Sequence, residues 1–525
     1  MKKDHYINSW LNEYNDQMKI RVEKREEMLK KNINPYKNGF APNILSSEIH
    51  ALYNHLNKEE IEVAAKGKVY KLAGRVLLVR SFGKAAFLSF DDGSEKFQLY
   101  VKREELDAAS IAEYDFVDYG DVVYAEGEAF KTNKGELSLK VHKFVLLTKS
   151  IRPLPEKFHG LSDPELRYRM RYVDLIMNPK GRDTFIKRAN IIRYIRDFFY
   201  KRQYLEVETP MLHSVAGGAT AKPFLTHHNA LDMPMYMRVA PELHLKRLIV
   251  SGYPRVFELN RCFRNEGLSL KHNPEFTSIE FYQAYATYVD LMDLTEDLIN
   301  GLAKDVMKTE EIVFDDKKIS LAKPFKRMSM KESIVQYTSL KMEDLDDREK
   351  LISLLKTKGH AISDLQKHST IDLMVLCFDE FVEKNLIQPT FITEYPTAIS
   401  PLSRRNDQNP EIVDRFELFI NSWEVANAFS ELNNPLDQLL RFAEQAVKKD
   451  QGDDEAQSMD YDYVRALEYG MAPTAGEGIG IDRLCMILTN NHSIRDVLLF
   501  PQLKNEQFFS QETPDTPETQ ETPEE

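Results

Sequence analysis

The chain has 525 residues, of which 42% are hydrophobic and 29% are charged, a balance typical of a soluble globular protein. The length is too great for a single hydrophobic core, so two or three domains are expected. No run of about 18 apolar residues occurs, and the N-terminus lacks the apolar stretch of a secretory signal, which argues against a membrane span and against secretion. The formal net charge of −13 does not suggest a nucleic-acid-binding protein overall. A local basic patch would still allow such binding.

Three cysteines, Cys262, Cys377 and Cys485, are far apart in the sequence, and none belongs to a CxxC pair. This spacing argues against a zinc site and against a disulfide framework, and it suits a reducing compartment. We therefore expect a cytoplasmic protein.

Residues 1–62 form a polar N-terminal extension with one clear helical segment, DQMKIRVEKREEMLKK, which Pro35 follows as a stop signal. The positions near helical spacing are Met18, Val22, Arg25 and Leu29. The segment is also rich in lysine and arginine. Two interpretations are open: a solvated surface helix, which is the commoner meaning of a charge run, or a helix that lies on an RNA backbone.

Residues 63–150 contain five short runs rich in β-forming residues, separated by turn signals such as Asp92-Gly93 and Asn133-Lys134-Gly135. Five strands in a segment of this length predict a small closed barrel, and an OB-fold is the obvious candidate. The mixed aromatic and basic composition suits single-stranded nucleic acid. Small barrels have many functions, so this pattern alone does not fix one.

The remaining chain predicts a connector, a large α+β domain and a tail. We expect a linker over residues 151–182 and mixed helices and long strands over 183–510, with a polar, helix-rich insertion at about 305–390. An amphipathic helix, TFIKRANIIRYIRDFFYKRQ, precedes the predicted strand YLEVETPML. The acidic, proline-rich residues 511–525 cannot bury a core and are expected to be disordered.

The stretch VFELNRCFRNEGLSLKHNPEFTSIEFYQAY predicts two strands joined by a polar loop. Alternation places Glu258, Asn260, Cys262 and Arg264 on one face of the first strand, and Ser278, Glu280 and Tyr282 on one face of the second. One surface then gathers Arg264, Glu280 and Tyr282, and the loop adds Glu266, His272 and Phe276. Since buried charges are costly unless they pair or hold a ligand, this set favours a binding site over a lone structural ion pair.

A second hairpin is predicted in RFELFINSWEVANAFSELNNP, with its turn near Asn421-Ser422. We expect Glu417 and Glu424 to lie roughly opposite each other on adjacent strands. Two facing carboxylates repel unless they share a proton or a cation, and a Mg²⁺ ion that carries substrate phosphates is the natural occupant. The alternative is a pair of solvated glutamates at a sheet edge.

The stretch PTAGEGIGIDR is rich in glycine but fits neither familiar phosphate loop. Its G-x-G-x-G spacing follows a predicted helix, YDYVRALEYG, rather than a strand, and no lysine follows as in a Walker A loop. We interpret it as a strand from Gly476 to Asp482 that continues into a helix, with Arg483 at the helix start. Glycine in a strand marks the close approach of a ligand or of another backbone, and tight packing alone would explain the stretch equally well.

These three segments, in this order, resemble the signature motifs of the class II aminoacyl-tRNA synthetases. FRNEG…KHNPEFT…EFYQAY resembles motif 2, AGEGIGIDR…RDVLLFP resembles motif 3, and the helix before EVETPML resembles motif 1. The barrel followed by the large domain is similar to subclass IIb. The segments AGGATAKPF, APELHLKRL, TFITEYP, SPLSRR and FSELNNP resemble the lysyl-tRNA synthetase family. The resemblance covers about residues 63–503. It implies an antiparallel sheet flanked by helices, a homodimer formed through motif 1, an anticodon-binding OB-fold, and ATP, L-lysine and tRNA(Lys) as partners.

By motif position, the resemblance also implies individual roles. Arg264 and Arg483 would be catalytic, and Glu417 and Glu424 would bind Mg²⁺. The residues implied for ATP are Arg264, Glu266, His272, Asn273, Phe276, Gly480 and Arg483, with the adenine between Phe276 and Arg483. The residues implied for lysine are Gly218, Glu242, Arg264, Glu280, Tyr282, Asn427, Phe429 and Glu431. The residues implied for the anticodon are Arg80, Phe87, Gln98 and Glu136.

Three residues depart from the usual family pattern. Ala426 and Ala428 stand where glycines are common, and their methyl groups are expected to narrow the lysine pocket or to change which lysine analogues enter it. Glu477 stands where a bulky apolar residue is common.

Two alternatives stay open. One is an aspartate or asparagine enzyme of the same class, which the acidic pocket without an obvious arginine for an acidic side chain disfavours. The other is a related binding protein without catalysis, or a relative that lysylates protein. The intact arginines and glutamates disfavour loss of catalysis, and the barrel favours tRNA as the acceptor.

Overall fold

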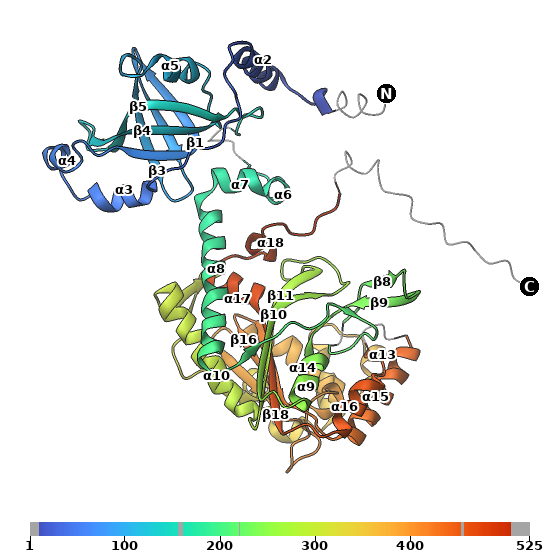
Figure 1. Cartoon of the computed structure of the whole chain (residues 1–525). Coiled ribbons are helices and arrows are strands. Elements are labelled where there is room, and N and C mark those ends of the chain that lie inside the picture. The colour runs from blue at the N-terminus through green and yellow to red at the C-terminus, as the bar shows by residue number, and fades with distance from the viewer. Residues whose placement is uncertain (1–9, 156–160, 220, 453–455, 506–525) are drawn as a thin grey trace, which may run out of the picture. The chain divides into compact units, whose positions relative to one another are not determined.

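The computed structural model describes residues 10–155, 161–219, 221–452 and 456–505, so the predicted disordered tail lies outside the described residues. The chain forms two compact units, Met1–Leu161 and Ser162–Glu525 (Figure 1). In the described ranges, no helix has the length and apolar content that a membrane crossing needs.

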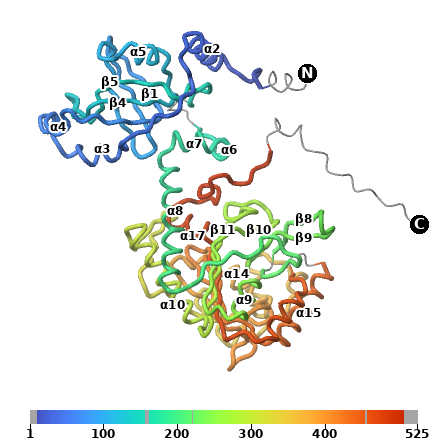
Figure 2. The backbone as a smooth tube through the Cα atoms, viewed as in Figure 1, coloured from blue at the N-terminus to red at the C-terminus, as the bar shows by residue number. Residues whose placement is uncertain are grey.

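The first unit is built on a closed five-stranded barrel in the order β1-β2-β3-β5-β4, which confirms the predicted OB-fold. All neighbouring strands are antiparallel except the β3–β5 pair. Leu88, Leu99 and Leu139 are fully buried inside it. Figure 2 shows β1, β4 and β5 of this barrel side by side. The strands are β1 Tyr70–Phe82, β2 Ala85–Asp91, β3 Lys96–Lys102, β4 Val122–Lys131 and β5 Leu137–Thr148.

Helices surround the barrel. The elements are α2 Asp16–Lys30, α3 Ser46–Tyr53, α4 Lys58–Ala64, the short 3-10 turn η1 Arg103–Glu105 and α5 Ala108–Tyr114. Asp107 caps the start of α5 by accepting a hydrogen bond from the Ser110 backbone N–H. The Phe144 N–H of β5 donates to the Ser110 hydroxyl, so α5 is tied to the barrel wall.

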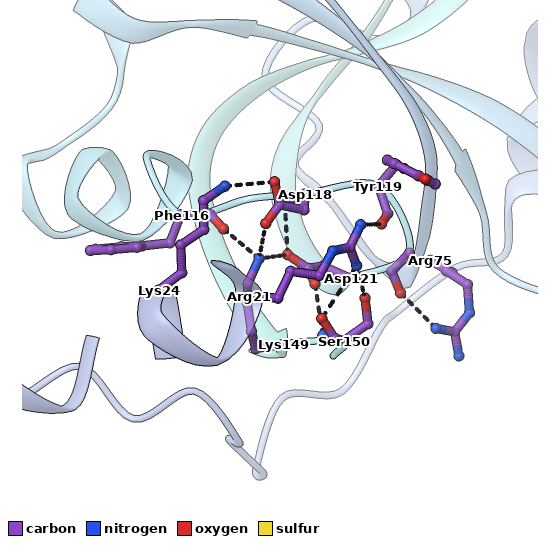
Figure 3. A network of polar contacts seen from close by, with 10 residues as sticks. Arg21, Lys24, Arg75, Phe116, Asp118, Tyr119, Asp121, Lys149 and Ser150 are labelled. Atoms are coloured by element: carbon purple, nitrogen blue, oxygen red, sulfur yellow. Dashed lines mark hydrogen bonds and ion pairs between the residues drawn. The ribbon is translucent and has the colours of Figure 1, made fainter. Parts of the chain in front are cut away.

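Helix α2 docks onto the barrel through basic residues, which corrects the predicted packing face (Figure 3). Its buried residues are Met18, Arg21 and Met28, whereas Leu29 is exposed. Arg21 donates to the Ser150 hydroxyl at 2.6 Å and to the Tyr119 carbonyl at 2.9 Å. Arg21 therefore fixes the helix to the first unit, because its guanidinium finds acceptors outside the helix.

A fully buried lysine lies at the centre of the same network (Figure 3). The Lys149 ammonium donates to the Phe116 carbonyl at 2.7 Å, to Asp118 at 2.6 Å and to Asp121 at 2.8 Å. Lys24 of α2 donates to the other oxygen of Asp118 at 2.7 Å. These contacts pair the buried Asp121 and the half-buried Asp118, and they supply acceptors for the buried ammonium.

The second unit begins earlier than the sequence predicts, because the expected linker contains packed helices. They are α6 Pro164–Arg169 and α7 Arg171–Met177, and α8 Pro179–Lys201 follows them. Arg171 is 1% exposed, pairs with Asp174 and donates to the carbonyls of Arg495 and Leu498. The prediction of a linker to residue 182 is therefore wrong beyond Leu161.

An eight-stranded sheet forms the centre of the second unit, in the order β14-β15-β16-β17-β18-β11-β10-β6. It is antiparallel except at its two edges, where β14 pairs with β15 and β6 with β10 in parallel. The strands are β6 Leu205–Glu206, β10 Arg255–Phe263, β11 Glu275–Ala284, β14 Lys326–Ser329, β15 Thr390–Thr393, β16 Arg415–Ile420, β17 Trp423–Ser430 and β18 Thr474–Gly480.

Helices pack on the sheet through separate cores. Phe257 and Phe281 point into a core shared with α8, α10 and α17, while Val256 and Tyr282 belong to a core with α9, α15 and α16. This division confirms the predicted alternation on β10 and β11. The helices are α9 Glu242–Val250, α10 Tyr288–Gly301, α15 Pro435–Asp450, α16 Tyr461–Glu468, α17 Ile481–Thr489 and α18 Ile494–Val497.

The predicted helical insertion at 305–390 is only partly helical. It contains the end of η2 (Leu302–Met307) and then a hairpin, and β14 joins the edge of the main sheet, so its α-helices begin only at Met330. Its elements are β12 Glu311–Phe314, β13 Lys317–Ser320, α11 Met330–Tyr337, η3 Met342–Asp344, α12 Arg348–Lys356, α13 Ile362–Leu365, α14 Thr370–Phe381 and η4 Glu383–Asn385. The other elements of the unit are η2 Leu302–Met307, η5 Thr397–Ile399, and the small sheet of β7 Leu212–His213, β8 Leu225–His228 and β9 Met233–Met237.

Candidate active site

The glycine-rich strand β18 lies between the two predicted hairpins. Gly478 is opposite Glu280 on β11 and opposite Asn427 on β17. Gly476 is likewise opposite Tyr282 and Phe429. Three segments that are far apart in the sequence therefore form adjacent strands with one shared face.

One cavity opens on this face. Glu417 and Glu431 are the two residues predicted for the active site that do not line it. The predicted residues that line it are Gly218, Glu242, Arg264, Glu266, His272, Asn273, Phe276, Glu280, Tyr282, Glu424, Asn427, Phe429, Gly480 and Arg483.

The glycines of β18 have different neighbours. A Cβ on Gly476 would overlap the Tyr282 ring and the Glu431 carboxylate, so this glycine is needed for side-chain packing. A Cβ on Gly478 would meet only the Glu280 Cγ at 3.5 Å, an ordinary contact, and Gly478 lines the cavity. Both explanations of the glycine stretch thus apply, each at a different residue.

Arginines and aromatic rings form one end of the cavity. The guanidinium of Arg264 lies 5.1 Å from the centroid of the Phe276 ring, so this cation covers a ring predicted to contact adenine. The Arg264 Nε is buried and has no hydrogen-bond partner among the described residues. Arg483 donates to the Glu424 carbonyl at 2.8 Å and lies 3.0 Å from the His272 Nε2. Burial and the neighbouring Arg483 lower the pKa of His272, which favours its neutral form.

Carboxyl groups gather at the other end. Glu280 is buried, and the Tyr282 hydroxyl donates to it at 3.1 Å. Burial, together with nearby Glu242, raises the pKa of Glu280 to about 8. Burial also raises the pKa values of Glu242 and Glu431. Burial makes the negative charge of these carboxyl groups costly, and a cationic ligand would stabilise that charge. The pocket is therefore suited to a cationic ligand.

Lys246 pairs with two of these carboxyl groups. It is fully buried on α9, and its ammonium forms ion pairs with Glu242 and Glu431. Burial works against its charge, but the two carboxylates outweigh that effect, and the pKa of Lys246 is raised. Glu431 therefore lies behind the cavity wall, against Gly476, and its partner in the structure is a residue of the protein.

The hairpin predicted to bind metal turns where the sequence predicts, but its two glutamates are offset by two residues instead of directly opposite each other. Asn421 and Ser422 form the turn with positive φ, but a bulge follows Leu418. The turn places Glu424 opposite Phe419, and the bulge places Glu417, two residues earlier on β16, opposite Asn427. The bulge shifts the strand by one residue, which a sequence pattern does not reveal.

Glu417 and Glu424 nevertheless interact electrostatically. Burial is the main cause that raises the pKa of Glu417 to about 7; Arg415 opposes this rise, and the nearby Glu424 adds to it. The Tyr395 hydroxyl donates to Glu417 at 2.8 Å, and Arg415 bridges it to Asn427. Burial and acidic neighbours, including both of these glutamates, raise the pKa of Glu383 to about 7 as well. The described residues contain no set of three or more histidine, cysteine or acidic side chains arranged to hold a metal.

The barrel places three of the four predicted anticodon residues close together. Arg80 on β1 is opposite Phe87 on β2, and Gln98 on β3 is opposite Ser89, two residues beyond Phe87. Gln98 accepts a hydrogen bond from the Ser138 hydroxyl at 2.8 Å. Glu136 is exposed just before β5.

Comparison with known proteins assigns each of the two units to a protein family. The family described as tRNA synthetases class II (D, K and N) matches residues 163–504, and the family described as OB-fold nucleic acid binding domain matches residues 70–147. The chain belongs to the class II tRNA synthetases. Members of this family are ATP-dependent ligases.

Similar proteins carry the name lysine–tRNA ligase. The protein from Dichelobacter nodosus is 51% identical over 94% of this chain and 98% of its own length. The protein from Vesicomyosocius okutanii is 51% identical, over 94% and 99% of the two chains. The protein from Edwardsiella ictaluri is 49% identical, over 93% and 96%.

The departures from the family pattern lie on the far side of the synthetase sheet. Ala426 and Ala428 point into the core, because alternation along β17 turns Asn427 and Phe429 toward the cavity. The expectation that their methyl groups narrow the lysine pocket is therefore wrong. Glu477 is 2% exposed on the same core side of β18, where the Thr295 hydroxyl lies 2.6 and 2.8 Å from its two oxygens. Burial raises the pKa of Glu477 far above its usual value.

Sequence reasoning missed two residues that hold the synthetase site in place. Lys246 follows Glu242 by four residues, a helical spacing that brings their side chains together. Arg415 precedes Glu417 by two residues, a strand spacing that places both on one face. Both signals are present in the sequence, but neither reveals the second partner, Glu431 or Asn427.

Proposed function

We propose that this synthetase is a lysine–tRNA ligase. It activates L-lysine with ATP to give lysyl-adenylate and pyrophosphate, and it then transfers the lysyl group to the 3′ end of tRNA(Lys). The relatives named lysine–tRNA ligase, which match nearly the whole chain, support this proposal.

The observation that carries the choice of amino acid is the balance of charges in the acidic end of the cavity. Glu242, Glu280 and Glu431 interact electrostatically with one another, and Lys246 forms ion pairs with Glu242 and Glu431 but not with Glu280. Three carboxyl groups thus share one paired ammonium. Lysine carries two ammonium groups, one on the main chain and one on the side chain, so it balances this pocket. Aspartate and asparagine bring only one ammonium group and leave an uncompensated carboxyl group, which is costly when buried.

We assign the ammonium contacts by position. Glu242 and the backbone of Gly218 bind the α-ammonium of lysine at the mouth of the pocket. Glu280 and Tyr282 bind the ε-ammonium, and Glu431 adds its charge from behind Gly476. Asn427, which Arg415 orients by donating to its side-chain oxygen at 3.1 Å, binds the lysine carboxylate, and Phe429 packs on the aliphatic chain.

The first reaction requires no side-chain nucleophile. The lysine carboxylate attacks the α-phosphate of ATP, a new P–O bond forms, and pyrophosphate leaves. Arg264 bridges the carboxylate and the α-phosphate and stabilises the charge that develops on the phosphorus oxygens. Arg483, Phe276, Glu266, His272, Asn273 and the backbone of Gly480 hold the nucleotide. In the second reaction, the 3′ hydroxyl of the terminal adenosine of tRNA attacks the lysyl carbonyl, and AMP leaves.

Glu417 and Glu424 fit a Mg²⁺ ion that ATP brings with it. Both offer carboxylate oxygens, which Mg²⁺ prefers, and their mutual repulsion is relieved by a cation. Because Mg²⁺ keeps substrate and water ligands, two protein carboxylates suffice. A bound Mg²⁺ would neutralise charge on the triphosphate. We also propose that the protein works in the cytoplasm as a homodimer formed through α8, which exposes Ile186 and Tyr200.

Lysine-dependent ATP–pyrophosphate exchange tests this function, with lysine, aspartate and asparagine assayed in parallel and tRNA(Lys) charging measured afterwards. Exchange with lysine alone is expected. The variant Glu431→Gln should raise the KM for lysine at least tenfold and leave the KM for ATP within about twofold, because it removes one pocket charge. Glu477→Gln is the matched control, since it changes a buried glutamate on the opposite side of the sheet.

Exchange with another amino acid would contradict the pocket assignment. No exchange in folded protein supplied with Mg²⁺ would indicate a binding protein. Equal losses for lysine and ATP in Glu431→Gln would show that Glu431 is structural.

A further inference from the structure

An aromatic row crosses the outer face of the barrel. The Phe87 and Tyr100 ring centroids are 5.0 Å apart, and Tyr100 is 5.7 Å from Phe130. On the other side of Phe87, the Phe82 ring lies 6.2 Å away, edge to face. The row therefore continues beyond Phe87 in both directions, although sequence reasoning singled out Phe87 alone.

Strand register places the row on one surface with the predicted anticodon residues. Arg80 is opposite Phe87, and Phe82 follows two residues later on the same face of β1, opposite Ala85. Tyr100 is opposite Phe87 on the other side. Leu88 and Leu99, which alternate with these rings, point into the barrel.

Phe82 is the most exposed ring of the row. It is 63% exposed, next to the Gly83-Lys84 turn, whereas Phe87, Tyr100 and Phe130 are half-buried. Arg80, beside it, is exposed, and its side chain has no hydrogen bond or ion pair to any described residue. An exposed ring beside an unpaired cation offers stacking and phosphate contacts together, which is how proteins bind unpaired nucleotides.

We propose that Phe82 is a second stacking platform for the unpaired anticodon loop of the tRNA, holding the base next to the one that stacks on Phe87. The proposal rests on the proposed function, since it takes tRNA as the acceptor. Arg80, which lies opposite Phe87 and two residues before Phe82 on the same face of β1, contacts the phosphate that joins the two bases. The recognised ligand is single-stranded RNA, because a base within a duplex has no free face for either ring.

The test uses the full-length protein and three variants. Phe82→Leu keeps an apolar side chain but removes the ring, and Phe82→Trp keeps a ring. Val63→Ala on α4, which removes an exposed apolar side chain away from the row, is the control. We expect Phe82→Leu to raise the KM for tRNA in lysine charging about tenfold, in the range of one lost base stack. Phe82→Trp and Val63→Ala should stay within about twofold of wild type, and lysine-dependent exchange should be unchanged in all three.

A second measurement identifies the base. Binding of an anticodon stem-loop RNA is compared between wild type and Phe82→Leu, with an abasic nucleotide placed at each unpaired position in turn. At one position next to the Phe87-bound base, the two proteins should bind equally, because the stacked base is missing from both complexes. A wild-type enzyme that charges tRNA, with Phe82→Leu showing an unchanged KM, would overturn the inference. Failure of the wild type to charge any tRNA would instead overturn the proposed function, and this inference with it.

Discussion

Glu477 is a carboxyl group buried between β18 and α10, with the Thr295 hydroxyl as its hydrogen-bond partner. Burial raises its pKa well above the usual value, so the folded chain keeps the proton while the unfolded chain loses it above about pH 4. Stability should therefore fall as pH rises above that value, by about 1 to 2 kcal/mol per pH unit, until the folded pKa is reached. Glu477→Gln lacks this titration and should be more stable than wild type at pH 8 but not at pH 5. Urea unfolding of both proteins at pH 5, 6.5 and 8 measures the difference, and a difference that does not change with pH would contradict the protonated state.

Strand β18 contains a matched pair of glycines with opposite expected behaviour. Gly476→Ala would force the Tyr282 ring and the Glu431 carboxylate apart, so we expect it to destabilise the second unit by about 1 to 3 kcal/mol and to raise the KM for lysine. Gly478→Ala has room for its methyl group and should keep or slightly increase stability, by up to about 1 kcal/mol. The methyl group of Gly478→Ala would enter the cavity, so the KM for lysine should rise without loss of stability. Unfolding and exchange kinetics on both variants test this. Equal stability of the two variants would show that packing at Gly476 relaxes freely.

The two units have separate cores, so damage to one should spare the other. Lys149→Met removes the buried ammonium of the barrel network and leaves Asp121, which is fully buried, without its cation. We expect the first unit to lose about 3 to 5 kcal/mol, enough to abolish tRNA charging at growth temperature, while lysine-dependent exchange in the second unit continues. Lys66→Met, at an exposed position of the same unit, is the control. Calorimetry of Lys149→Met should show the unfolding transition of the first unit at a lower temperature and that of the second unit unchanged. Parallel loss of exchange would show that the units are not independent.

Local sequence patterns determined the secondary-structure elements and the face of each element that is buried, because both depend on residues close together in the sequence. The alternation on β10 and β11 predicted which side chains enter the core, because successive side chains of a strand point to opposite faces. The five β-rich runs predicted the barrel, and the glycine stretch predicted a strand that continues into α17, with Arg483 in its first turn. The family motifs predicted the active-site residues. All of these residues except Glu417 and Glu431 line the cavity.

Only the tertiary structure decided the pairings between distant residues. The bulge after Leu418 places Glu417 opposite Asn427. Ala426 and Ala428 lie in the core, because they are on the face of β17 that points away from the cavity. The pairing of Lys246 with Glu431, and of Arg21 with the barrel, joins segments that no periodic pattern links. The physical reason is that register and ion pairing depend on how elements pack in three dimensions, whereas sequence periodicity reports only the face on which each side chain lies within its own element.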